Sequence, residues 1–315
     1  MARLRSEHLD LDSTLYYHCV SRCVRRAFLC GRDPYTGRDF EHRKEWIEER
    51  ILKLAQIFAV DLHAYAVMSN HLHIVVRVDP KRAESWTDRE VQRRYAKLFR
   101  FAAKEIEDRR PSERRALLAK WRERLSSLSW LMRCLNEAIA RRANREDECT
   151  GRFWEGRFRC QPLLDESALL TCMAYVDLNP VRAGVSKSAD TAENTSLSRR
   201  LRSSDVPTGL TPFADQLPKH SRRLSVPMAL ADYAEFLRWM SRCIRSGRSD
   251  AKPSSAAKRL LADLGVNSSQ FVETMGTQGL SSASALGSED AINEFAERHD
   301  KSWVGGKQLA QELFS

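Results

Sequence analysis

The sequence lacks the segments that would place it in a membrane or mark it for secretion. No stretch approaches the roughly 18 uninterrupted apolar residues that a helix needs to cross a bilayer. The first residues contain no apolar core of the kind found in signal peptides. We therefore expect a cytoplasmic protein, associated with the nucleoid if its partner is DNA.

Paired cysteines are also missing. The chain has 8 cysteines, but none of them forms a C-x-x-C pair, so neither a zinc ribbon nor a disulfide framework is expected. Most of these cysteines should be small buried residues with free thiols. The sequence also contains no internal repeat, which argues against a solenoid.

Positive charge is in excess, with 52 Lys and Arg against 42 Asp and Glu and a formal net charge of +10. Most of the excess lies before residue 186, and most of these bases are arginines. The planar arginine fork can bind a phosphate through two hydrogen bonds. Composition alone leaves two interpretations open: a polyanionic partner, most simply nucleic acid, or a solvated basic surface.

The most informative stretch predicts a hairpin of two strands, 60–68 and 70–78. Side chains alternate between the faces of a strand, so His71 and His73 share one face, while the other face is wholly apolar and belongs to a core. Two imidazoles on a rigid sheet can bind a divalent metal. Two histidines in a strand can equally be ordinary, partly buried residues.

The other patterns predict an α+β fold, an antiparallel sheet with packed helices. The predicted elements are a strand at 14–23, helices at 41–58, 84–108, 112–125 and 129–144, a short strand or hairpin at 150–160 that completes the sheet, and a helix from 165 that Pro180 stops. The helical segment at about 80–128 is rich in arginine.

The character of the sequence changes after residue 185. We expect one domain over 1–185, a linker or extension over 186–230, and a small helical region of unknown role over 231–315. Short helices are predicted there at 233–244, 256–264, 267–275 and 288–297.

Segment 150–160 combines aromatic and basic side chains. Rings that stack on bases and guanidinium groups that hold phosphates are typical of single-stranded nucleic acid binding. The same rings could anchor the segment in the core, and we expect some of each. The residues predicted to contact nucleic acid here and elsewhere are Arg22, Arg25, Arg141, Arg142, Arg152, Phe153, Trp154, Arg157 and Arg182.

A tyrosine and a carboxamide complete the candidate site. Tyr175 and Asn179 are four residues apart and should project from one face of the helix that begins at 165. Together with the histidine pair, they suggest phosphoryl transfer through a covalent tyrosine. A phenol with a pKa of about 10 is a poor nucleophile, and a nearby cation would polarise and position the phosphate. A phosphotyrosine would conserve the bond energy for religation.

Four segments of the chain resemble the single-tyrosine HUH transposases, most closely those associated with repetitive extragenic palindromes. The segments are Tyr16-Tyr17-His18-Cys19-Val20-Ser21-Arg22, Met68-Ser69-Asn70-His71-Leu72-His73-Ile74-Val75, Gly151-Arg152-Phe153-Trp154-Glu155-Gly156-Arg157-Phe158 and Ala174-Tyr175-Val176-Asp177-Leu178-Asn179-Pro180-Val181-Arg182-Ala183-Gly184. They span roughly residues 10–185. This domain therefore resembles an IS200-like transposase domain, and the resemblance implies a ferredoxin-like HUH fold. Compared with minimal members of that family, the arginine-rich segment at about 80–128 is a longer insertion.

The resemblance also implies an activity and its residues. Tyr175 matches the nucleophile, His71 and His73 match the metal ligands, and Asn179 stands where the family supplies a third ligand, often glutamine. The cofactor would be Mg²⁺ or Mn²⁺. The partner would be single-stranded or hairpin DNA, with repetitive palindromic elements as its source, and the protein could form a homodimer. The alternative is a catalytically inactive DNA-binding protein of the same fold.

Overall fold

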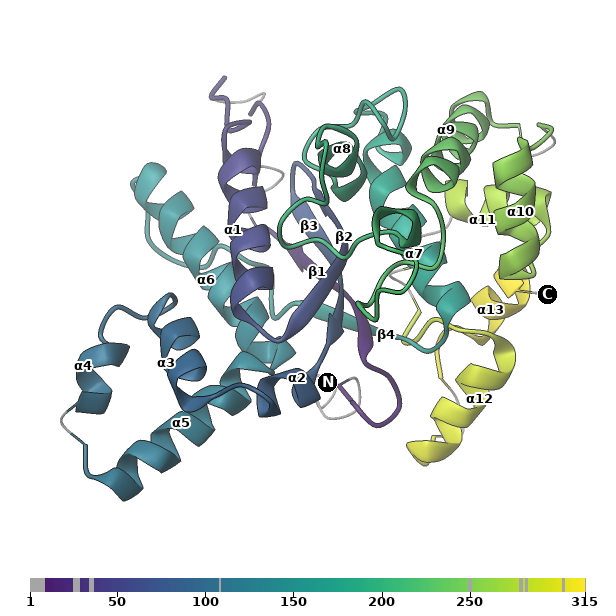
Figure 1. The fold of residues 1–315 in the computed structure, drawn as a ribbon. Helices are drawn as coiled ribbons and strands as arrows, with labels where there is room; N and C mark the ends of the chain where they lie inside the picture. Colours follow the sequence, from purple (N-terminus) through teal and green to yellow (C-terminus); the bar gives the residue numbers. More distant parts are fainter. Residues whose placement is uncertain are drawn as a thin grey trace.

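A four-stranded antiparallel sheet lies at the centre of the molecule (Figure 1). The computed structural model describes residues 9–24, 29–33, 37–107, 109–248, 251–277, 280, 283–301 and 304–314. The strands are β1 (Tyr16–Arg22), β2 (Val60–Val67), β3 (His71–Val78) and β4 (Arg159–Leu163), in the spatial order β2-β3-β1-β4. The hairpin of β2 and β3 confirms the predicted pair of strands.

Two helices connect the strands. Helix α1 (Arg43–Ile57) joins β1 to β2, and α6 (Leu128–Glu146) lies between β3 and β4 in the chain. In each unit the two joined strands are separated in the sheet by a strand of the other unit, which is the split βαβ arrangement of ferredoxin-like folds. The α+β, ferredoxin-like prediction is confirmed.

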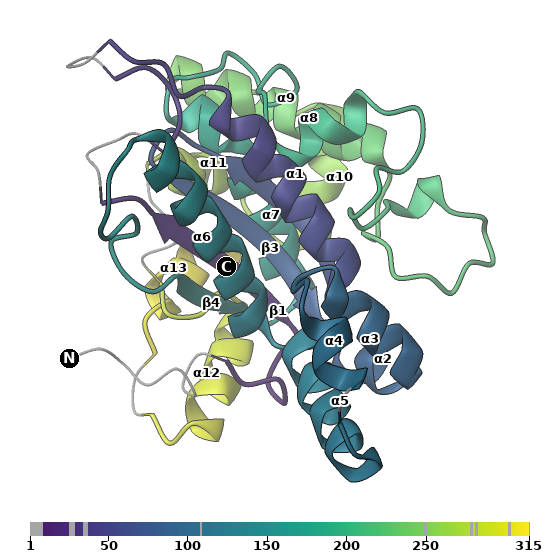
Figure 2. The ribbon, with the colours of Figure 1, turned by 90° about the vertical axis from the view of Figure 1, so that its left-hand side faces the viewer.

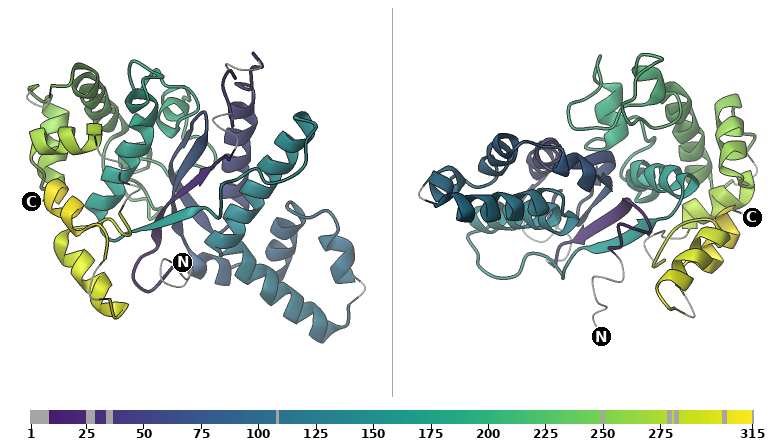
Figure 3. Two further views of the ribbon diagram at one scale, coloured as in Figure 1. Left: turned by 180° about the vertical axis from the view of Figure 1, so that it is seen from behind. Right: turned by 60° about the horizontal axis from the view of Figure 1, so that its bottom comes forward.

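The two faces of the sheet are covered by different parts of the chain. Helices α1 and α6 cover one face (Figure 2), where Leu72, Ile74 and Val76 enter a core shared with both helices. The other face, which we call the histidine face, is covered by α7 (Glu166–Arg182) and the helices that follow it (Figure 3). His73 lies on this face because strand side chains alternate.

The predicted insertion is a group of short helices that projects from the body in Figure 1. It comprises α2 (Pro80–Glu84), α3 (Asp88–Ala96), α4 (Ala102–Glu107) and α5 (Pro111–Leu125). The single helix predicted over 84–108 is therefore wrong. Helix α3 starts only after Thr87, whose hydroxyl accepts a hydrogen bond from the Glu90 backbone N–H as an N-cap. The chain then leaves the helix again after Ala96, and α4 begins at Ala102.

Two boundaries near the candidate site also differ from prediction. The strand that completes the sheet begins only at Arg159, and within segment 151–158 Trp154 forms an isolated antiparallel bridge with Cys23. Helix α7 continues through Pro180 to Arg182. A proline inside a helix removes one backbone hydrogen bond at a cost of about 3 kcal/mol. Burial of this helix end, including Pro180 and Val181, offsets that cost.

The chain after residue 185 shares its core with α7. Segment 186–230 contains α8 (Ser196–Leu201) and η2 (Ala214–Gln216) and buries Leu197, Phe213 and Val226 against that helix. The remaining helices are α9 (Leu230–Ser246), α10 (Ser255–Leu264), α11 (Ser268–Thr277), α12 (Glu289–Arg298) and α13 (Lys307–Phe314). Among the described residues, no helix combines the length and apolar character that crossing a bilayer requires.

Asp177 links α7 to this C-terminal part. Its buried carboxylate accepts hydrogen bonds from Ser196 Oγ at 2.7 Å, the Leu197 backbone N–H at 3.0 Å and Tyr233 Oη at 2.9 Å. Burial raises the pKa of Asp177, and these hydrogen bonds together with the charge of Arg200 act in the opposite direction. One side chain thus holds α8 and α9 against the helix that carries Tyr175.

Asp177→Ala should therefore lower the free energy of unfolding by about 3 kcal/mol or more, because three buried donors lose their acceptor. Urea unfolding followed by circular dichroism measures this change. Asp177→Asn keeps one carboxamide oxygen and should cost less. Equal stability of the Ala variant and the unchanged protein would contradict the structural role.

Candidate active site

The two histidines of the hairpin lie beside each other at the start of β3. Their ring centroids are 4.8 Å apart in an edge-to-face arrangement. His73 is buried, with 2% of its surface exposed, whereas His71 is half-buried. Asn70, the last residue of the turn, lies next to His71 and its Oδ1 contacts His71 Nδ1 at 2.5 Å. The pair therefore stands on the histidine face, as the alternation of strand side chains requires.

A third histidine, to which the sequence assigned no role, completes the cluster. His18 on β1 stacks on His73 with 5.1 Å between ring centroids, and its Nε2 lies 2.8 Å from His73 Nδ1. Its other nitrogen, Nδ1, lies 3.1 Å from Gln161 Oε1. Strand pairing brings these residues together, because Gln161 lies directly opposite His18 and Val20 lies opposite His73.

These contacts determine which nitrogens carry protons. Gln161 Nε2 donates to the carbonyls of Leu280 and Ala283, at 2.7 and 3.1 Å, so Gln161 Oε1 must face His18. His18 Nδ1 is then the donor and its Nε2 the acceptor, and His73 donates from Nδ1. The lone pair of His73 therefore lies on Nε2, which is buried and has no hydrogen-bond partner among the described residues. A buried, unprotonated imidazole nitrogen of this kind fits a metal ion.

Gln161→Leu should remove this control of the tautomer. Long-range ¹H–¹⁵N spectra of histidine-labelled protein should show His73 protonated at Nδ1 in the unchanged chain and a mixture of tautomers in the variant. Gln308→Leu on α13, where Gln308 Nε2 donates to Glu312 Oε1 at 2.9 Å, is the matched control. An identical His73 spectrum in the Gln161 variant would contradict the hydrogen-bond chain that runs from Gln161 through His18 to His73.

Burial also keeps the histidines neutral. It lowers the pKa of His71 to about 4, with the positive charge of Arg22 acting in the same direction. Burial lowers the pKa of His73 well below its ordinary value, and His18, His71, Arg182 and Arg22 add to the effect. Neutral imidazoles retain the lone pairs that a metal needs. Arg22 and Arg182, two of the residues predicted to contact nucleic acid, act electrostatically on this cluster.

Tyr175 lies against the histidines from the opposite side. Its ring centroid is 6.0 Å from that of His73 and 6.1 Å from that of His18, in edge-to-face contact with both. The guanidinium carbon of Arg182 lies 4.4 Å from the centroid of the Tyr175 ring, one side of which it covers. Helix α7 thus brings the predicted tyrosine to His73, one member of the predicted histidine pair. Only 5% of the surface of Tyr175 is exposed.

Asn179 is held by the helix that carries it. Its Nδ2 donates to the Tyr175 carbonyl at 3.2 Å, which leaves Oδ1 as the atom that could bind a cation. Among the described residues, no group of three or more His, Cys, Asp and Glu side chains is arranged to hold a metal ion. A cation bound by the histidine pair would therefore need oxygen ligands from Asn179, water or a substrate.

The residues predicted to contact nucleic acid are arginines, most of them exposed, and two aromatic residues. The exposed arginines are Arg22, Arg141, Arg142, Arg152 and Arg157. Two of these already have neighbours, since Arg141 pairs with Glu137 at 2.5 Å and Arg142 covers the Trp46 ring at 4.5 Å. Arg25 lies outside the described residues.

The aromatic residues of segment 150–160 serve mainly as anchors. Phe153 is 2% exposed and belongs to the core with α6, so the prediction that its ring contacts nucleic acid is wrong for this conformation. Trp154 is half-buried, and its Nε1 donates to the Asn136 carbonyl at 2.9 Å. Its ring also packs edge-to-face on Phe153, with centroids 4.9 Å apart.

Comparisons with known proteins address the family. No curated protein matches the chain. A solved structure of a REP-associated tyrosine transposase bound to a REP hairpin is similar to this chain at 12% sequence identity and a TM-score of 0.40, covering 71% of this chain and 100% of that chain. Residues 12–115 match the family model described as transposase IS200 like. The matched segment carries His18, His71 and His73.

Proposed function

We propose that the protein is a metal-dependent DNA strand transferase that cleaves and rejoins single-stranded or hairpin DNA through a covalent 5′-phosphotyrosine at Tyr175. The observation that carries this proposal is the contact of the Tyr175 ring with the His18–His73 pair, at centroid distances of 6.1 and 6.0 Å. The family match supports the DNA-processing class, but it ends at residue 115, so the tyrosine comes from outside the matched segment.

The proposed reaction follows from the groups that meet there. Tyr175 Oη attacks a backbone phosphorus, the bond to the 3′ oxygen breaks, and the phosphate stays on the tyrosine while a 3′-hydroxyl leaves. Mg²⁺ or Mn²⁺, held by His71, His73 Nε2 and Asn179 Oδ1 or a water, would polarise the phosphate for in-line attack. Arg22 and Arg182 would stabilise the negative charge of the DNA at this site.

One observation favours a second candidate, a DNA-binding protein of the same fold without catalysis. Tyr175 is only 5% exposed and belongs to the core cluster around α7, which is the packing expected of a structural tyrosine. This candidate predicts binding of hairpin DNA without any covalent product.

Covalent chemistry separates the two candidates. Labelled hairpin DNA with single-stranded flanks is incubated with the protein and Mn²⁺, and the products are separated on denaturing gels. The proposal predicts a denaturation-resistant adduct that disappears after protease digestion. Retention on native gels with no adduct would instead support the binding-only candidate and contradict the transferase.

A further inference from the structure

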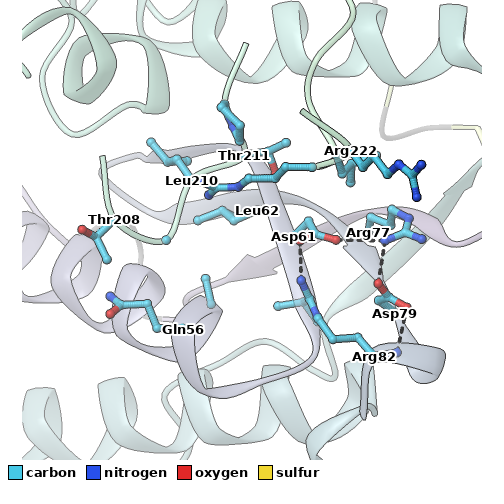
Figure 4. A pocket seen from close by; sticks show the side chains of 16 residues that line it. Gln56, Asp61, Leu62, Arg77, Asp79, Arg82, Thr208, Leu210, Thr211 and Arg222 are labelled. Carbon is cyan, nitrogen blue, oxygen red and sulfur yellow. Dashed lines mark hydrogen bonds and ion pairs between the residues drawn. The ribbon is translucent and has the colours of Figure 1, made fainter. Parts of the chain in front are cut away.

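A basic cavity lies at the other end of β3 from the histidine pair (Figure 4). Its volume is about 650 Å³, and its walls come from the β2 and β3 strands, the start of α2 and the segments 208–212 and 222–224. The charged residues that line it are Asp61, Arg77, Asp79, Arg82, Arg222 and Arg223. Four guanidinium groups thus face two carboxylates, and the cavity is positively charged.

Asp61 holds two of these arginines in place. Arg77 Nη1 donates to Asp61 Oδ2 and Asp79 Oδ2, at 3.0 Å each, and Arg82 Nη1 donates to Asp61 Oδ1 at 2.7 Å. The aspartates are therefore already engaged with one nitrogen of each guanidinium group. The remaining N–H groups of Arg82 need acceptors from elsewhere.

Arg82 has two such donors without a partner. Its Nε and Nη2 are buried and make no hydrogen bond with any described residue. These two nitrogens form the edge of the guanidinium group that presents parallel N–H bonds, the geometry that matches two oxygens of a phosphate. Buried donors left unpaired are destabilising, and an oxyanion that reaches them from the cavity would accept a hydrogen bond from each.

The opposite wall supplies further positive charge. Arg222 and Arg223 are exposed, and the structure gives neither an ion pair with any described residue. In Figure 4, Arg222 extends above Arg77 and Asp61, with Arg82 on the other side of them.

Gly209 shapes the cavity wall: its φ is +95°, and a Cβ there would lie 2.8 Å from the Leu52 carbonyl oxygen. Glycine therefore lets segment 208–212 pack closely on α1.

We propose that this cavity binds a phosphate group, with the Arg82 fork on two of its oxygens and Arg222 and Arg223 approaching from the opposite wall. The source we favour is the DNA backbone, a choice that rests on the proposed function. Arg77 lies on the same face of β3 as His73, about 13 Å further along the strand, so one DNA molecule can contact both places. A free nucleotide offers the same phosphate chemistry.

Salt dependence tests the DNA source. The double variant Arg222→Ala/Arg223→Ala is compared in a Tyr175→Phe background, without added metal, by fluorescence anisotropy of a labelled hairpin at several salt concentrations. The negative slope of log K against log salt should become shallower by about 0.7–0.9 for each lost phosphate contact. Each lost contact should also lower the affinity roughly five- to eightfold at 0.1 M salt. Lys258→Ala/Arg259→Ala on α10 removes the same charge elsewhere and should leave the slope nearly unchanged. Equal slopes in the two double variants would overturn the DNA source.

A direct titration tests the phosphate site itself. Inorganic phosphate and ADP are titrated calorimetrically into the full chain and into Arg82→Lys, which keeps the charge but lacks the fork. Saturable binding that weakens at least about fivefold in the variant supports the site. Nucleotide binding together with equal hairpin slopes assigns the site to free nucleotides. If neither phosphate nor ADP binds and the two double variants have equal slopes, the phosphate site is refuted. Both readouts measure binding, so a failure to form the covalent adduct would leave this inference standing.

Discussion

Tyr175→Phe should abolish the covalent adduct and reduce DNA cleavage by at least about 10³-fold, because the substitution removes only the attacking oxygen. The ring, its contacts with His18 and His73, and the guanidinium group of Arg182 over it all remain. Hairpin affinity should therefore change by less than about twofold, since no positively charged group that holds the DNA backbone is lost. Denaturing gels and anisotropy measure the two quantities on the same samples.

The matched control is Tyr16→Phe. Tyr16 lies on the same face of the sheet and loses the same oxygen, but it pairs with Arg77 at the far end of β3. Its variant should retain the adduct. Cleavage that survives in Tyr175→Phe would show that water, not the tyrosine, is the nucleophile, and an adduct in that variant would assign the chemistry to another residue.

His71→Ala should eliminate both cleavage and its response to added metal. The half-buried imidazole of His71 is held neutral by burial, with a pKa lowered to about 4, so it offers a lone pair at neutral pH. Its loss leaves His73 Nε2 as the remaining imidazole ligand of the pair. We expect Mn²⁺ affinity, followed by the electron paramagnetic resonance signal of free Mn²⁺, to fall by at least about 100-fold.

A distant histidine provides the control for this prediction. His42 contacts Glu146 at 2.6 Å on the α1–α6 side of the sheet, with 54% of its side chain exposed. His42→Ala should bind Mn²⁺ and cleave DNA like the unchanged protein. Unaltered Mn²⁺ affinity in His71→Ala would remove the metal from the proposed mechanism.

Periodicity predicted the parts of the fold that repeat regularly. The alternation along 70–78 placed His71 and His73 on one face, and the helical spacing of apolar residues located α1 and α6 to within a few residues. Helix ends within the charged segment 84–108 were harder to recognise: Thr87 caps the start of α3, and α3 ends at Ala96 before α4 begins at Ala102. At Pro180 the rule that a proline ends a helix is overridden by the burial of the surrounding turn.

The site was predicted only where its residues lie close in sequence or carry a motif. His18 and Gln161 escaped because their roles depend on the register of β1 with β3 and β4, which joins residues 55 and 143 positions apart. A histidine in the first predicted strand was a signal, but its partner could not be chosen without that register. The anchoring of Gln161 by Leu280 and Ala283 was beyond sequence reasoning for the same reason.

The shared core of α7 and the C-terminal helices bears on how the protein can be shortened. Leu197, Phe213 and Phe236 are each 0% exposed and lie in one cluster with α7 residues. A chain cut after residue 185 would therefore turn the apolar side of the tyrosine helix toward water and lose the carbonyls that orient Gln161. We expect such a fragment to aggregate, so any shortened version of this protein has to keep the C-terminal helices that cover α7.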